Sequence, residues 1–115
     1  MASPVVVVHF KDVEIDEVVR EAVERRCDHL ADEFHEAARF ELTIEGNGTG
    51  FAVHGHATGK HTDVATHARA DTARTASDQV LEKIERQLRK LHDKRIFSQR
   101  REAQKHPPKR NGGAA

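Results

Sequence analysis

Apolar residues follow two periods along this chain, and together they predict six elements. The run from Pro4 to Phe10 is continuous and β-branched, which is typical of a strand buried on both faces or nearly so. Asp16 next offers a helix N-cap, with Glu17 in the first turn. Apolar residues then recur at helical spacing, which predicts one buried stripe on a helix that runs to about residue 34. This stripe consists of Val19, Val23, Cys27, Leu30 and Phe34.

Three alternating runs follow this helix and are separated by turn signals. The first run ends at Gly46-Asn47-Gly48 and the second at Gly59-Lys60, and both signals favour tight turns. Period-two alternation predicts a strand with one buried face in each run. The alternating positions are Phe40, Leu42 and Ile44, then Phe51, Val53, Gly55 and Ala57, and finally Val64, Thr66, Ala68 and Ala70.

A second, longer helix is predicted from about Thr72 to Ile96. The order β-α-β-β-β-α predicts an α+β fold, in which a four-stranded sheet carries two parallel helices packed on one face. The core stripe of the second helix consists of Val80, Ile84, Leu88 and Leu91, with Leu81 beside them.

The composition changes after Ile96. Residues 98–115 hold no apolar side chain larger than Ala, contain Pro107-Pro108 and end in NGGAA. A chain of 115 residues fits one domain. We therefore predict a folded domain over residues 4–97 and a disordered basic tail over residues 98–115.

Composition and spacing exclude several classes of protein. Cys27 is the only cysteine, which rules out an internal disulfide and a thiolate zinc site and indicates a small core residue. No apolar run approaches the roughly 20 residues that span a bilayer, and the N-terminus lacks the basic region of a signal peptide. No spacing in the sequence pairs a nucleophile with a general base. No Gly-rich phosphate loop precedes a predicted helix. We therefore expect a cytoplasmic protein with no membrane partner, no enzymatic activity, no cofactor and no small-molecule substrate.

Charge is distributed unevenly along the chain, although the formal net charge is zero. Between Lys11 and Glu45, twelve acidic and five basic residues give a balance of −7. Between Lys83 and Arg110, eleven basic and three acidic residues give a balance of +8. A chain that is basic at one end can bind a polyanion at that end.

A row of cations is predicted on the second helix. At about 100° per residue, four cations fall in one stripe about 80° wide, beside the core stripe. On the first helix, Arg26 and His29 flank the apolar stripe. If these flanks are adjacent they form a cationic groove between the helices, which can meet regularly spaced phosphates and release counterions. The alternative is a solvated face with i,i+4 ion pairs. The four cations are Lys83, Arg86, Lys90 and Lys94.

Histidines on the predicted strands raise the possibility of a metal site. His54 and His56 share one strand face, and His61 and His67 lie on the next strand. A cross-strand cluster of histidines can bind zinc. No carboxylate stands at an obvious ligand spacing, however, so we favour exposed polar residues and predict no metal site.

Two segments resemble the ribosome hibernation-promoting factors, also called the sigma-54 modulation or ribosome-associated inhibitor family. They are VEIDEVVREAVERRCDHLADEF (13–34) and DQVLEKIERQLRKLHDK (78–94), and the likeness spans about Val6 to Arg95. The resemblance implies the β-α-β-β-β-α fold described above. It also implies a short-form member that inhibits translation in stress by binding the small ribosomal subunit and its 16S-type rRNA. The implied site is the channel for messenger RNA and transfer RNA.

The resemblance also implies which residues contact RNA, by position on the two helices. His29 stands where a Lys is usual, and Arg89 stands where the pattern varies. The second helix opens differently from the family pattern, since Arg74 replaces the usual Tyr and Ser77 the usual Ile, which marks a divergent member. The implied RNA-binding residues are Arg26, His29, Lys83, Arg86, Arg89, Lys90 and Lys94.

Two other functions are compatible with the sequence. A generic double-stranded-RNA-binding module would also present basic helices on a sheet. Positive charge in a groove between the helices favours the ribosome, whereas separate patches on loops and helix ends favour a duplex. A protein-interaction adaptor would instead use the acidic first helix. The acidic residues of that helix include Glu17, Glu21, Glu24 and Asp28.

Overall fold

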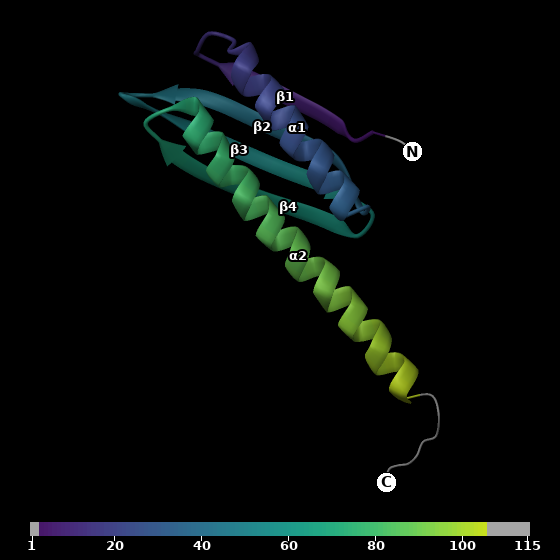
Figure 1. The fold of residues 1–115 in the computed structure, drawn as a ribbon. Coiled ribbons are helices and arrows are strands. Elements are labelled where there is room, and N and C mark those ends of the chain that lie inside the picture. The colour runs from purple at the N-terminus through teal and green to yellow at the C-terminus, as the bar shows by residue number, and fades with distance from the viewer. Residues whose placement is uncertain (1–2, 106–115) are drawn as a thin grey trace.

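The structure, a computed structural model, is a four-stranded sheet with two helices on one face (Figure 1). It describes residues 3–105, and the side chains of residues 3–94. The elements are β1 (Val5–Lys11), α1 (Glu17–Glu33), β2 (Ala37–Asn47), β3 (Gly50–Gly59), β4 (Thr62–Ala70) and α2 (Ala73–Lys105).

The sheet order follows the sequence, β1-β2-β3-β4. β1 pairs in parallel with β2 through the α1 crossover, and the other two pairings are antiparallel. Helix α1 lies over β1 and β2, and α2 packs mainly on β3 and β4, running in the same direction as α1 (Figure 1). This arrangement confirms the predicted α+β fold.

Both helices begin at a side-chain cap. The Asp16 carboxylate accepts hydrogen bonds from the backbone N–H groups of Val18 and Val19, at 3.0 and 3.3 Å. The Thr72 hydroxyl accepts one from the N–H of Thr75 at 3.1 Å. These caps satisfy N–H groups that have no partner within the helix, which explains why the helices start where they do.

The core lies between the helices and the inner face of the sheet. The predicted stripes are buried on both helices except for Leu91, which is half-buried, and the alternating positions of β2, β3 and β4 face them. Burial raises the pKa of the Cys27 thiol to about 12, so this side chain is a neutral core residue at physiological pH. The largest fully buried side chains include Phe40, Leu42, Ile44, Val53, Leu81 and Ile84.

Strand β1 is less buried than its sequence predicts. None of its seven residues is fully buried, and Val5 is 51% exposed. The prediction of burial on both faces is wrong because β1 is an edge strand and the helices cover only one face of the sheet. A β-branched run reports strand propensity and does not show how many layers cover the strand.

The two hairpin turns lie one or two residues beyond the predicted signals. Strand β2 runs through Asn47, and the loop is Gly48-Thr49, with Gly48 at a φ of 64°. The second loop is Lys60-His61. Gly59 is needed for close approach, because a Cβ there would lie only 1.7 Å from the Glu36 carbonyl oxygen.

Helix α2 is longer than predicted, since it ends at Lys105 and not near Ile96. The segment 98–105 is therefore helical, which its Gln, Arg, Glu, Ala and Lys residues favour. The remainder of the predicted tail, residues 106–115, lies outside the described residues. The division at residue 97 into a domain and a tail stays a prediction. Over residues 3–105, neither helix is long and apolar enough to cross a membrane.

Ser77 of α2 lies in the core. It is completely buried, and its hydroxyl has no hydrogen-bond partner among the described residues. Ser77→Ala is therefore expected to raise the free energy of unfolding by about 1 kcal/mol, since a buried hydroxyl without a partner is destabilising. Thermal melting followed by circular dichroism would show a rise of about 4 °C. A lower melting temperature would instead show that the hydroxyl makes a stabilising hydrogen bond.

Candidate nucleic-acid interface

Four cations follow one flank of α2, and the first three of them line a hollow between this flank and β4. We call Lys83, Arg86, Lys90 and Lys94 the α2 basic surface, and all four side chains are exposed. The Lys83 ammonium donates a hydrogen bond to the carbonyl oxygen of His67 on β4, at 2.8 Å. An open hollow of about 430 Å³ lies between this flank and β4. Its lining residues are Ala65, Thr66, His67, Lys83, Arg86, Gln87 and Lys90.

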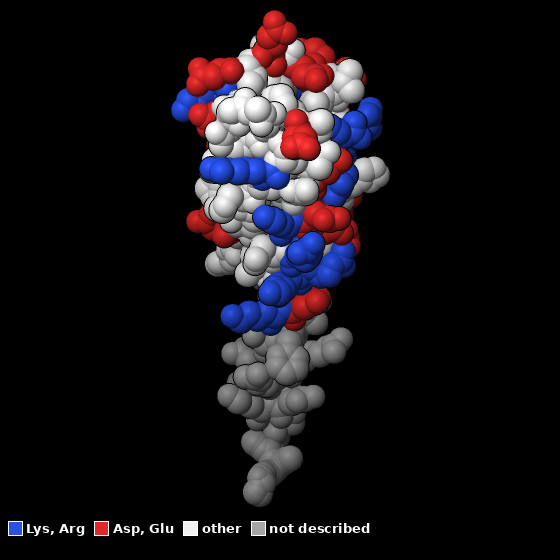
Figure 2. Space-filling view, turned by 90° about the vertical axis from the view of Figure 1, so that its left-hand side faces the viewer, with Lys and Arg blue, Asp and Glu red and all other residues white. Residues whose placement is uncertain are grey.

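The charge of this surface is largely uncompensated. Arg86 forms an exposed i,i+4 ion pair with Glu82 at 3.6 Å, which contributes little to stability. Lys90 and Lys94 have no acidic partner within the described part of the chain. Figure 2 shows one face of the molecule. Lys and Arg gather on the half of that face next to the grey C-terminal segment, and Asp and Glu are prominent at the opposite end. The alternative interpretation, a solvated helix face with i,i+4 ion pairs, accounts for Arg86. It does not account for Lys90 and Lys94, which have no such pair among the described residues.

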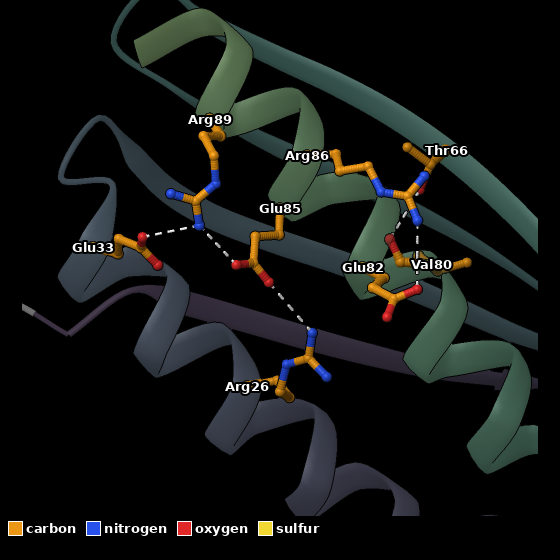
Figure 3. A network of polar contacts seen from close by, with 8 residues as sticks. All are labelled: Arg26, Glu33, Thr66, Val80, Glu82, Glu85, Arg86 and Arg89. Atoms are coloured by element: carbon orange, nitrogen blue, oxygen red, sulfur yellow. Dashed lines mark hydrogen bonds and ion pairs between the residues drawn. The ribbon is translucent and has the colours of Figure 1, made fainter. Parts of the chain in front are cut away.

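The space between the helices holds a neutral ion network (Figure 3). The Arg89 guanidinium donates to Glu85 at 3.0 Å and to Glu33 on α1 at 3.1 Å. Arg26 on α1 lies 3.7 Å from Glu85. The hydrogen bond that Arg89 donates to Glu85, followed by the charge of Glu33, raises the pKa of Arg89 above its ordinary value. Two arginines and two glutamates thus face each other across the helix interface.

The predicted cationic groove between the helices is therefore wrong in its geometry. The structure brings Lys83, Arg86 and Lys90 together, but over β4 and away from α1. Arg26 and Arg89 lie in the ion network, and His29 lies exposed on α1. A helix has two flanks beside its core stripe, and periodicity alone does not say which flank meets the neighbouring helix. Their roles as RNA contacts stay predictions.

The sequence also gave no indication that β4 belongs to this surface. Thr66 and His67 line the hollow below α2. Both belong to β4, which lies beneath this flank of α2 because it is the last strand in the sheet order. Their alternation marked them as strand residues. Which helix would lie over them depends on long-range packing, for which the local sequence carries no signal.

The strand histidines that raised the possibility of a metal site lie in different settings. No group of three or more His, Cys, Asp or Glu side chains within residues 3–94 could hold a metal ion. His54 and His67 are cross-strand partners, whereas His56 contacts Asp63 at 2.6 Å. His61 lies in the β3–β4 turn with a φ of 53°.

The two residues that depart from the family pattern at the start of α2 lie in different environments. Arg74 is exposed and pairs with Asp78 at 3.5 Å, one helical turn away. Its guanidinium therefore lies on the surface, where an arginine is readily tolerated. Ser77 is the buried residue of this pair of departures.

Comparison with known proteins agrees with this fold and identifies its family. The family model described as sigma 54 modulation protein / S30EA ribosomal protein matches residues 6–96. A search of curated protein sequences finds no match.

Two solved structures share the fold at low sequence identity. The N-terminal domain of Protein Y from Thermus thermophilus has a TM-score of 0.67 and 14% identity, covering 78% of this chain and 99% of that one. A ribosomal subunit interface protein from Coxiella burnetii has a TM-score of 0.63 and 18% identity, covering 76% of this chain and 98% of that one. The family match spans α1, β2, β3 and β4 completely, and it covers β1 except Val5 and α2 up to residue 96, which includes the α2 basic surface. This chain therefore belongs to the sigma 54 modulation protein / S30EA ribosomal protein family.

Proposed function

We propose that this protein associates with the ribosome and inhibits translation by occupying the channel for messenger RNA and transfer RNA on the small subunit. The observation that carries the proposal is the family match over residues 6–96, which includes the exposed and largely uncompensated α2 basic surface. The protein acts by occupancy, in the cytoplasm, without a catalytic step. The related Coxiella burnetii protein is described as a ribosomal subunit interface protein, which supports the same partner.

The α2 basic surface suits an rRNA backbone. Its four cations repeat at three- and four-residue intervals, so they form one row along the helix. Lysine and arginine in such a row neutralise successive phosphates and release their counterions, which favours binding and makes it sensitive to salt. Recognition of this kind depends on RNA shape and backbone more than on base sequence.

Arg26, His29 and Arg89 are proposed as secondary RNA contacts. Arg89 already contacts two carboxylates, and Arg26 contacts one of these. A phosphate that approached either arginine would have to compete with Glu85. The α2 basic surface therefore supplies most of the binding energy in this proposal.

A generic duplex-binding module is less well supported. Separate patches on loops and helix ends were expected for that function, whereas the cations here form one row along a single helix. The family match also favours a ribosomal partner. The acidic adaptor function has no observation in its favour beyond the exposed carboxylates of α1.

Sedimentation with purified ribosomes tests the proposal. At low salt, the full-length protein is expected to migrate with isolated small subunits and to leave that fraction as the salt concentration is raised, because counterion release weakens the complex. Large subunits run in parallel provide the control for nonspecific attraction to rRNA. A protein that remains at the top of the gradient, or that binds both subunits equally well, would contradict the proposal.

A further inference from the structure

The open face of the sheet, opposite the helices, carries histidines in two different settings. His9 on β1 lies 3.0 Å from the Glu41 carboxylate, and His56 on β3 lies 2.6 Å from the Asp63 carboxylate. Those two imidazoles each have an acidic partner, so the charge they could present to an anion is already balanced locally.

The remaining two histidines of this face lie together and form no ion pair with a carboxylate of the described residues, although Glu41, which pairs with His9, lines one hollow with them. His54 on β3 and His67 on β4 are register partners, with ring centroids 5.8 Å apart and ring planes inclined by 31°. Neither ring contacts a carboxylate within residues 3–94. Both side chains are exposed, so their ring faces are available to a ligand.

These rings line a hollow that continues into the α2 basic surface. We call His54, His67, Arg69 and Lys83 the β4-edge hollow; it also includes Ala52 and Ala68 and encloses about 430 Å³. It shares His67 and Lys83 with the hollow beneath α2. The Lys83 ammonium lies where the two meet, because it is bonded to the His67 carbonyl oxygen. Neither lining contains an aspartate or a glutamate, although the chain has 19 of them.

We propose that the β4-edge hollow binds an unpaired nucleotide of the RNA whose backbone lies along the α2 basic surface. This inference deepens the proposed function and rests on it for the identity of the RNA. Imidazole rings and guanidinium planes are surfaces on which unpaired RNA bases stack, and an ammonium or guanidinium group contacts the phosphate. A base held in a duplex has no free face, so the ligand is a nucleotide in a loop, bulge or single strand.

The affinity of two double variants for the small ribosomal subunit tests whether the hollow contributes to binding. The affinity for purified small ribosomal subunits is expected to fall about fivefold to tenfold in His54→Ala/His67→Ala, which removes both stacking surfaces. The matched control is His9→Ala/His56→Ala, which removes the two acid-paired histidines of the same face and should change affinity less than about twofold. All four side chains are exposed, so both variants should melt like the wild type.

A fluorescent variant tests stacking directly. The chain has no Trp and no Tyr, so His67→Trp would introduce its only tryptophan. Oligouridylate is expected to quench this fluorescence, because a base stacks on the indole ring. Inorganic polyphosphate, which carries the charge without bases, should bind the cations and leave most of the fluorescence unchanged.

The proposal requires both results. Absence of quenching by oligouridylate, equal quenching by polyphosphate, or an equal loss of affinity in the two double variants would overturn it. If the subunit binds normally to the His54→Ala/His67→Ala variant and quenching is absent, the hollow is refuted and the proposed function stands. If oligouridylate quenches but the wild-type protein does not bind small subunits, the proposed function is refuted, and of this proposal only the nucleotide site survives, without ribosomal RNA as its ligand.

Discussion

Replacing both Arg86 and Lys90 with glutamate is expected to weaken binding to the small ribosomal subunit by about 100-fold, since a charge-assisted contact contributes about 1.5–3 kcal/mol. Both side chains belong to the α2 basic surface and line the hollow over β4. The substitutions remove two phosphate contacts and place two negative charges against the RNA backbone. The affinity should also depend less steeply on salt, because fewer counterions are released per complex.

The same variant should fold normally. Both residues are exposed, and among residues 3–94 the one ion pair that is lost joins Arg86 to Glu82 at 3.6 Å. The matched control is Lys11→Glu/Arg39→Glu, which makes the same charge change on exposed residues of β1 and β2, in the half of the sheet away from β4. If the two variants lose the same affinity, net charge and not the α2 basic surface governs binding.

A large effect on stability is expected at Gly55, where α2 lies directly on β3. A Cβ at this position would lie 2.4 Å from Val80 Cγ1 and 3.1 Å from Ile84 Cδ1, and both of those side chains are fully buried. The β-branched Val80 cannot turn aside without entering a strained rotamer. Gly55→Ala is therefore expected to lower the free energy of unfolding by about 3 kcal/mol and the melting temperature by at least about 10 °C.

A double-mutant cycle separates this close contact from a general intolerance of β3. Val80→Ala alone leaves a cavity and should destabilise the protein by about 2 kcal/mol. In the Gly55→Ala/Val80→Ala variant, the new methyl group occupies part of that cavity, so the loss should be clearly smaller than the sum of the two. Additive losses would mean that the distance between α2 and β3 is not set by this pair.

The local pattern of the sequence was sufficient to predict the elements and the core. Whether Leu42 or Ile84 is buried depends on the side of a strand or helix on which it lies, and this follows from the period of the backbone alone. The Asp16 cap is equally local, because the carboxylate bonds N–H groups two and three residues ahead. Features of this kind were confirmed almost residue by residue.

The side of α2 that carries its function could not be predicted in the same way. The stripe that contains Lys83, Arg86 and Lys90 was correctly placed beside the core stripe, but its neighbour is β4 and not α1. That choice depends on the crossover of α1 over β1 and β2, which leaves β3 and β4 to α2. The burial of β1 was mispredicted for the same reason. Whether other elements cover a strand depends on the whole fold and not on the local sequence.

The interhelix ion network explains why the groove itself is a poor site for phosphates. Arg89 also lies over the Phe34 ring, with its guanidinium carbon 5.4 Å from the ring centroid. Together with the contacts to Glu33 and Glu85, this holds the guanidinium within the helix interface. The chain therefore uses part of its positive charge to join the helices and presents the rest over β4.

Competition on the small ribosomal subunit tests the central claim most directly. Purified small subunits, programmed with messenger RNA and a labelled transfer RNA in the P site, would be titrated with the full-length protein. The account predicts that the protein releases the transfer RNA, and that the Arg86→Glu/Lys90→Glu variant does so only at about 100-fold higher concentration. Simultaneous binding of the protein and the transfer RNA to one subunit would contradict the claim that this protein occupies the decoding channel.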